Sequence, residues 1–279
     1  MIETLLHKWL KVPHALHVGY DSGNRSAATT VVLIHGLASS HTMWNNVVKE
    51  VRTDAIRIIS VDLLGFGDSP KPVWQTYSAK IHATSLRATL RKKGIRGHIV
   101  LAGHSLGALV AVQYASLYPS KVHELVLCSP PFYRPTKVIG TAMKITVPQA
   151  DDIYRSMYRY SRTKTELAKR LAGYITRAKI MDNAFVVTDE TLPAITSSLE
   201  MSIENQTSLE DAEKLSIPMH IIYGQFDPFI IKRNLRQLNK RLDNVTIDYV
   251  LAGHEISGSK VYTKKVIERI NASIPRADS

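Results

Sequence analysis

The chain has 279 residues, of which 44% are hydrophobic and 22% charged, a composition typical of an ordinary soluble globular protein. No apolar run approaches the roughly 20 residues of a membrane-spanning helix, so we expect no membrane span. The formal net charge of +12 is compatible with nucleic acid, an anionic membrane or an acidic substrate as a partner.

Cysteine usage and the N-terminal sequence predict the compartment. The single cysteine, Cys128, excludes an intramolecular disulfide and is typical of a reducing environment. The first residues, MIETLLHKWLKVP, lack the basic segment followed by an apolar segment that marks a signal peptide. We therefore expect a cytoplasmic protein.

Short β-branched runs alternate along the chain with longer segments of helical spacing. An antiparallel edge strand is expected at 15–23. Buried strands are expected, in chain order, at 31–35, 56–62, 98–103, 122–128, 219–224 and 245–253. Helices are expected at 41–52, 76–94, 105–119, 228–242 and 259–270. Strands that are apolar throughout indicate a mostly parallel sheet with helices on both faces, so the pattern predicts an α/β fold.

The alternation stops between about Pro130 and Asp211, where prolines are followed by helical patterns. We therefore expect an α/β core from 1–130 and 212–279, with residues 131–211 inserted as a helical cap over the sheet's carboxyl edge. Arginine and tyrosine interleave at 154–179, a pattern compatible with a stacking and phosphate-binding surface. A solvated helix face is the favoured interpretation. No recognised nucleic-acid motif accompanies the segment, so no nucleic-acid partner is expected.

Residues 101–112, LAGHSLGALVAV, place a hydroxyl between two glycines where a predicted strand meets a predicted helix. This is the G-x-S-x-G pattern of a sharp elbow that holds a serine in a strained conformation above a sheet. We expect Ser105 to be a nucleophile. The first helical amide, at Leu106, is expected to stabilise an oxyanion because helix N-termini carry unpaired N–H groups.

A serine nucleophile needs a base to take its proton and an acid to orient that base. Asp227 follows the strand at 219–224, and His254 follows the last strand. The order serine, acid, histidine is the one expected for this type of site. Asp243 and Asp248 are alternatives to Asp227, the first at a helix end and the second within a strand.

A second oxyanion donor is expected in the loop after the strand at 31–35. Gly36 lets this loop turn inward, so that the Leu37 amide faces the same point as the Leu106 amide. His35 and His104 belong to these motifs but are expected to be structural.

The motifs HGLASS (35–40), DLLGFGDSPKP (62–72), GHSLGA (103–108), GQFDP (224–228) and AGHE (252–255) together resemble those of the α/β-hydrolase superfamily. The resemblance covers essentially the whole chain. It implies the α/β-hydrolase fold, the three triad roles and a helical cap. The loop at 62–69 resembles the family's structural loop after the fourth strand, with Phe66 near the pocket.

Other residues are assigned on weaker grounds. An apolar substrate lining is expected from five side chains, each of which core packing also explains: Trp44, Phe66, Met143, Tyr154 and Tyr158. Cys128 is expected to be a small, buried hydrophobic residue and not a nucleophile. The chain has no HExxH, CxxC or GxxxxGK[ST] motif, so we expect no metal and no cofactor.

The predicted chemistry is cleavage of a carboxylic ester, a thioester or a lactone through an acyl-enzyme, with a small-molecule ester as substrate. Serine at the elbow argues against haloalkane dehalogenases and epoxide hydrolases, which use aspartate there. A carbon–carbon bond hydrolase of the ring-cleavage-product type stays open as an alternative. So does a non-catalytic binding protein on the same fold. The sequence does not predict the oligomeric state.

Overall fold

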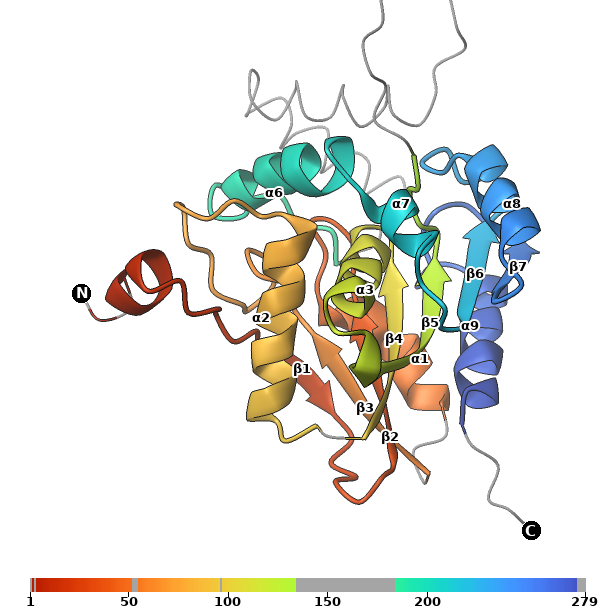
Figure 1. Ribbon diagram of the computed structural model, residues 1–279, viewed down its shortest axis with the longest axis horizontal. Helices are drawn as coiled ribbons and strands as arrows, with labels where there is room; N and C mark the ends of the chain where they lie inside the picture. Colours follow the sequence, from red (N-terminus) through yellow and green to blue (C-terminus); the bar gives the residue numbers. More distant parts are fainter. Residues whose placement is uncertain (1, 3, 52–54, 96, 134–183, 275–279) are drawn as a thin grey trace, which may run out of the picture.

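The computed structural model describes residues 2, 4–51, 55–95, 97–133 and 184–274. Within these residues one seven-stranded sheet has the order β1-β3-β2-β4-β5-β6-β7. The strands are β1 (Val18–Asp21), β2 (Thr29–Ile34), β3 (Ile56–Val61), β4 (His98–His104), β5 (Val122–Cys128), β6 (Met219–Gly224) and β7 (Val245–Val250). β1 runs antiparallel to β3, and the other neighbouring pairs are parallel. The predicted α/β fold is confirmed (Figure 1).

Helices cover both faces of this sheet. They are α1 (Asn45–Glu50), α2 (Ala79–Lys92), α3 (Leu106–Leu117), α6 (Leu192–Ser198), α7 (Ser208–Ala212), α8 (Lys232–Arg241) and α9 (Lys260–Ala272). Helical turns of the 3₁₀ or π type are η1 (Thr4–Trp9), η2 (His41–Trp44), η3 (Pro119–Lys121) and η4 (Leu199–Glu204). One core contains side chains of α2, α3 and α8, and the other contains side chains of α1 and α9.

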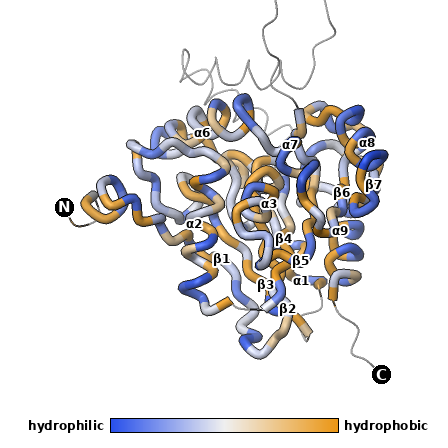
Figure 2. The backbone as a smooth tube through the Cα atoms, viewed as in Figure 1, coloured by the Kyte–Doolittle hydropathy of each residue, from blue (hydrophilic) through white to orange (hydrophobic). Residues whose placement is uncertain are grey.

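The central strands are buried on both sides, which explains their unbroken apolar sequence. Successive side chains of a strand point to opposite faces. Val32 and Ile34 of β2 accordingly lie in the core under α2 and α3, whereas Val31 and Leu33 lie in the core under α1 and α9. Hydrophobic residues therefore concentrate along the strands and inner helix faces, and hydrophilic ones on the outer faces (Figure 2).

Two α-helices, α1 and α8, begin four residues later than their spacing predicts. The helix expected at 228–242 starts at Lys232, because Asp227 Oδ1 accepts a hydrogen bond from the Phe229 amide at 2.8 Å and holds a turn before it. The helix expected at 41–52 opens as the tight turn η2, which Ser40 caps, before α1 begins at Asn45.

The segment expected to form a cap lies mostly outside the described residues, since 134–183 are not described. Its described end, 184–211, contains α6, η4 and the start of α7. Ser202 Oγ donates to the Tyr77 carbonyl at 2.8 Å, and Ser197 Oγ accepts from the Tyr77 amide at 3.0 Å. These bonds hold α6 and η4 against the segment between β3 and α2. This contact lies at the edge of the sheet where the parallel strands end (Figure 1). No helix among the described residues is long and apolar enough to cross a membrane.

Candidate active site

Ser105 occupies a strained turn between β4 and α3. Its backbone φ of 52° and ψ of −116° lie outside the regions that L-residues favour. A side-chain carbon at Gly103 would overlap the Gly107 carbonyl, and one at Gly107 would overlap the Ile34 carbonyl. Glycine is therefore required on both sides of the serine, because β4, α3 and β2 approach too closely for a Cβ. The Ser105 amide donates to the Cys128 carbonyl at 2.9 Å, which fixes the turn to the end of β5.

Asp227 and His254 are brought together at the carboxyl ends of β6 and β7. His254 Nδ1 lies 2.8 Å from Asp227 Oδ2, and both residues are buried, at 6% and 5% exposure. Asp227 Oδ1 accepts from the Phe229 amide at 2.8 Å. The carboxylate therefore has a partner on each oxygen and one fixed orientation toward the imidazole.

The two side chains shift each other's ionisation. Burial raises the pKa of Asp227, but the charge of His254 and hydrogen bonds from His254, Ser129 and the Phe229 amide outweigh it and leave this pKa below its ordinary value. Burial lowers the pKa of His254, but the Asp227 carboxylate outweighs it and raises this pKa above its ordinary value. The buried pair therefore favours an ionised aspartate that stabilises an imidazolium.

His104 connects His254 to the serine elbow. Its Nε2 donates to the His254 carbonyl at 2.9 Å, and the centroids of the two rings lie 4.7 Å apart. Burial lowers the pKa of His104 to about 3, so its ring is neutral at pH 7 and its proton lies on Nε2. Because His104 directly precedes Ser105, this bond ties the loop that carries His254 to the main chain of the elbow.

The loop after β2 packs directly on Ser105. A Cβ at Gly36 would lie 3.3 Å from the Ser105 Cβ and 3.0 Å from His104 Nδ1, so the Gly36 backbone runs along the serine. His35 Nε2 accepts from the Leu63 amide at 2.8 Å, and its Nδ1 donates to the Gly36 carbonyl at 2.7 Å. Burial lowers the pKa of His35 to about 4, so the ring is neutral at pH 7. Its two hydrogen bonds fix the position of this loop, which is a structural role. Leu37, which follows Gly36, is 7% exposed.

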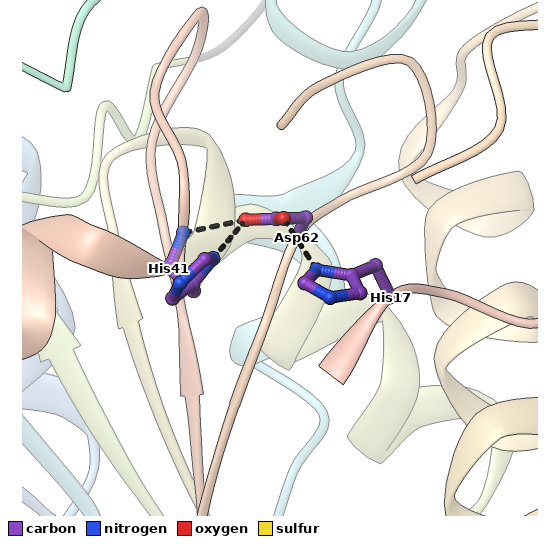
Figure 3. Close-up of side chains that lie close together, drawn as sticks. All are labelled: His17, His41 and Asp62. Atoms are coloured by element: carbon purple, nitrogen blue, oxygen red, sulfur yellow. Dashed lines mark hydrogen bonds and ion pairs between the residues drawn. The ribbon is translucent and has the colours of Figure 1, made fainter. Parts of the chain in front are cut away.

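A second group of polar side chains surrounds Asp62 at the end of β3 (Figure 3). Asp62 Oδ2 lies 2.9 Å from His17 Nδ1, and Asp62 Oδ1 lies 2.9 Å from His41 Nδ1. The amides of His41 and Asp68 donate to the same carboxylate, at 2.6 Å and 2.9 Å. Burial acts to raise the pKa of Asp62, yet these amides and His17 lower it to about 2. The carboxylate is ionised across the physiological range.

A cavity of about 490 Å³ opens beside this group. Its lining comes from the loop after β2, the loop after β3 and the chain before α6. Asp62, Phe66 and His41 are among the lining residues, whereas Ser105 and His254 are not.

The residues expected to line a substrate pocket lie in different parts of the structure. Phe66 lines the cavity beside Asp62. Trp44 is fully buried in the core under α1 and α9, on the sheet face opposite α2 and α3. Met143, Tyr154 and Tyr158 lie outside the described residues, as does the whole arginine–tyrosine segment at 154–179.

His17 and His41 were not singled out by any sequence motif. They reach Asp62 because β1 pairs antiparallel with β3, with Val18 opposite Val61, and because η2 follows the loop after β2. Among the described residues, two groups have three ligand atoms near enough to share a metal ion: His17, His41 and Asp62, and His104, His254 and Glu255.

Comparison with protein families and curated proteins relates the chain to hydrolases. A family model described as alpha/beta hydrolase fold matches residues 29–260. A probable lysophospholipase of Arabidopsis thaliana, BODYGUARD 4, is 32% identical over 114 residues, which are 40% of this chain and 27% of that protein. Lipase 3 of a Moraxella species is 23% identical over 80% of this chain and 70% of the lipase. The match thus spans only about a quarter of the length of the Arabidopsis relative.

Solved structures agree at the level of the fold. An esterase from Exiguobacterium antarcticum superposes with a TM-score of 0.72 over 93% of this chain and 95% of its own, at 16% identity. The enol-lactonase of Burkholderia xenovorans superposes with a TM-score of 0.68 over 91% of this chain and 96% of its own, at 21% identity. With its sheet order, its serine elbow and a family match over most of its length, the chain belongs to the alpha/beta hydrolase fold family.

Proposed function

We propose that the chain is a serine hydrolase that cleaves small carboxylic esters, thioesters or lactones through an acyl-enzyme on Ser105. The observation that carries the proposal is the buried 2.8 Å hydrogen bond between Asp227 and His254, joined through His104 to the strained serine elbow. The family and the esterase, lipase and lactonase names among its relatives support a hydrolytic reaction on an acyl compound.

His254 serves as the base in this proposal. Its Nδ1 donates to the ionised Asp227, so a neutral ring keeps its lone pair on Nε2. Nε2 takes the proton from Ser105 Oγ as the oxygen attacks the substrate carbonyl, and it returns that proton to the leaving alcohol. In the second half of the reaction, Nε2 takes a proton from water as the water oxygen attacks the acyl carbonyl, and it returns that proton to Ser105 Oγ as the acid leaves. Asp227 orients the ring and stabilises its cationic form.

The amides of Leu37 and Leu106 serve as the oxyanion donors. Leu106 is the first residue of α3, and amides in a helix's first turn have no acceptor within the helix. Leu37 follows Gly36, whose backbone packs on Ser105. In well-studied enzymes the loss of one such donor lowers the rate by about 10²–10³. The carbonyl is polarised by these amides, so the proposed mechanism needs no cofactor.

The proposed substrate is a small molecule held beneath a helical cap formed by residues 131–211. The described end of this segment supports the assignment, because α6 and η4 bind the chain after β3 on the side where Asp227 and His254 lie. The free, buried thiol of Cys128 supports a cytoplasmic location, because free thiols are typical of a reducing compartment.

The experiment is a hydrolysis assay on p-nitrophenyl esters of increasing acyl length, with lactones and a dienone in the same panel. We expect a burst of p-nitrophenol from short-chain esters and loss of turnover in Ser105→Ala. Ser116→Ala is the matched control, because Ser116 is an exposed residue near the far end of α3. An unchanged rate in Ser105→Ala would refute the assignment, and turnover of the dienone alone would replace ester cleavage by carbon–carbon cleavage.

A further inference from the structure

We propose that His17, His41 and Asp62 form a binding site for a divalent transition metal ion of the zinc type. The two imidazoles approach one carboxylate from either side, each with Nδ1 at 2.9 Å from a different oxygen (Figure 3). The three ligand atoms lie within 4.8 Å of one another. The proposal is independent of the hydrolytic function, because it uses none of Ser105, Asp227 and His254.

The surrounding backbone packs closely against the His41 ring and the Asp62 carboxylate. A Cβ at Gly19 would overlap the His41 ring, and a Cβ at Gly67 would overlap the Asp62 carboxylate. Gly67 also has a φ of +50°, a conformation that other residues rarely adopt. Glycines from two separate segments, β1 and the loop after β3, thus allow the chain to close on the imidazole and the carboxylate.

Further hydrogen bonds fix the ligands in place. The His41 and Asp68 amides hold the Asp62 carboxylate, at 2.6 Å and 2.9 Å. The Asp62 amide donates to the His17 carbonyl at 3.0 Å, and the His17 amide donates to Ser69 Oγ at 2.8 Å. Such outer bonds orient metal ligands and strengthen the site. The ligands are therefore held by three chain segments that the metal would join.

The donor set is that of a zinc-type ion. Two imidazoles and a carboxylate suit zinc and its first-row neighbours, which bind these groups at about 2.0–2.2 Å. Ligand atoms of one tetrahedral ion lie about 3.4 Å apart, so ligand atoms that now lie within 4.8 Å of one another must move closer together to close the site. The Asp68 carboxylate, 3.9 Å from His17 Nδ1, lies near enough to supply a fourth ligand.

An ion has a way into the site. His41 and Asp62 both line the 490 Å³ cavity, and Asp68 lines it as well. The His17 side chain is 37% exposed and that of His41 is 19% exposed, whereas Asp62 is fully buried. The carboxylate therefore forms the floor of the site, and the imidazoles form its open side.

Metal binding changes which nitrogen of each imidazole carries a proton, and it keeps the two amide hydrogen bonds to Asp62. Asp62 is ionised and can only accept, so each Nδ1 now carries the proton that it donates. When Nδ1 binds the metal, a neutral ring carries its single proton on Nε2 instead, and a protonated ring releases one proton to water. The two amide bonds to Asp62 stay, and two metal–nitrogen bonds and one metal–oxygen bond to Asp62 replace the two N–H···O bonds.

The experiment is calorimetric titration of the full chain with Zn²⁺ after treatment with EDTA and desalting. We expect one Zn²⁺ per chain and a rise in the unfolding temperature when Zn²⁺ is present. His17→Gln and His41→Gln keep an N–H donor for Asp62 but remove the imidazole, so each should weaken binding by at least about 10-fold. Their unfolding temperatures without metal should stay near that of the wild type.

Two controls separate this site from other histidines. His254→Ala removes a ligand of the group His104, His254 and Glu255, and it should leave Zn²⁺ affinity unchanged. His98→Gln alters an exposed histidine pair, with His123 at 3.3 Å, and should also leave it unchanged. No binding by the wild type, or binding lost in His254→Ala and retained in His17→Gln, would overturn the proposal.

A second measurement covers the case in which the glutamine variants fail to fold. X-ray absorption of Zn²⁺-loaded His254→Ala should show two imidazole nitrogens and carboxylate oxygens at about 2.0–2.2 Å from the metal. A spectrum without imidazole ligands would overturn the proposal as well.

Discussion

Asp227 and His254 meet at 2.8 Å although they belong to loops that follow two different strands. β6 and β7 are parallel and in register from Met219 opposite Val245 to Gly224 opposite Val250, so their carboxyl ends lie side by side. A side chain at Gly224 would overlap the Gly253 carbonyl, which shows how closely the two loops cross. The sheet register therefore creates the pair on which the proposed chemistry depends.

Replacing Asp227 by asparagine should remove activity and keep the fold. An amide of the same size no longer selects the Nδ1–H form of His254 or stabilises its cation. In the well-studied serine triad this change lowers kcat by about 10⁴. We expect a similar loss of ester turnover in Asp227→Asn, measured by steady-state kinetics.

Asp248→Asn is the matched control for that change. Asp248 is a half-exposed residue of β7 that pairs with Lys265 at 3.3 Å. Its variant should retain wild-type turnover. Loss of turnover in Asp248→Asn with retention in Asp227→Asn would show that the acid had been assigned to the wrong residue.

The pH profile should report the raised pKa of His254. The base acts as neutral imidazole, so kcat/KM should increase with pH through this pKa. Because Asp227 raises the pKa of His254 from its ordinary 6.5, the midpoint of the acid limb should lie above pH 6.5 in the wild type. In Asp227→Asn the midpoint should move to lower pH, since burial alone disfavours the cation. A midpoint that moves to higher pH would contradict the assignment.

Gly107→Ala should destabilise the protein, because the new methyl group would overlap the Ile34 carbonyl where α3 packs on β2. Crowding of this kind costs about 1–3 kcal/mol, and it should also displace the serine elbow and lower ester turnover. Gly258→Ala is the control, since a Cβ there meets no atom within 4 Å. Urea unfolding of the three proteins tests the difference. Equal stabilities would show that the elbow tolerates a side chain.

The ion pair between β1 and β3 should make stability depend on pH. Arg57 donates to both oxygens of Asp21, at 2.9 Å and 2.7 Å, and this bond lowers the pKa of Asp21 from 3.8 to about 2. That shift corresponds to about 2 kcal/mol of stability, present above pH 3.8 and lost as the pH falls through 2. Asp21→Asn should therefore lower the free energy of unfolding by about 2 kcal/mol at pH 7.

Urea unfolding from pH 7 downward measures this effect, and the difference between wild type and Asp21→Asn should vanish near pH 2. The same change at the exposed pair of Asp248 and Lys265 should cost less than about 1 kcal/mol. A pH-independent difference at Asp21 would mean that the loss arises from packing.

Local patterns in the sequence were enough to predict the serine elbow and the fold around it. Glycines two residues before and two residues after Ser105 indicate a close approach of backbone, and the structure has one at both. The predicted strands at 122–128 and 219–224 agree residue for residue with β5 and β6, in which apolar side chains predominate.

Other features depend on contacts that no local pattern records. The cluster of His17, His41 and Asp62 needs the antiparallel pairing of β1 with β3 and the turn η2 after β2. The helical spacing of Trp44 fits both a pocket-lining residue and a core residue. It lies in the core because of the side of the sheet that α1 covers, which no local pattern records. The late start of α8 follows from one side-chain bond, from the Phe229 amide to Asp227.

The proposed nucleophile is tested most directly by labelling with a fluorophosphonate, followed by intact mass measurement and peptide mapping. One adduct per chain should form on Ser105, persist in Ser116→Ala and be absent from Ser105→Ala. A chain that gains no adduct, or that gains the same adduct after Ser105→Ala, would contradict a serine hydrolase built on this elbow.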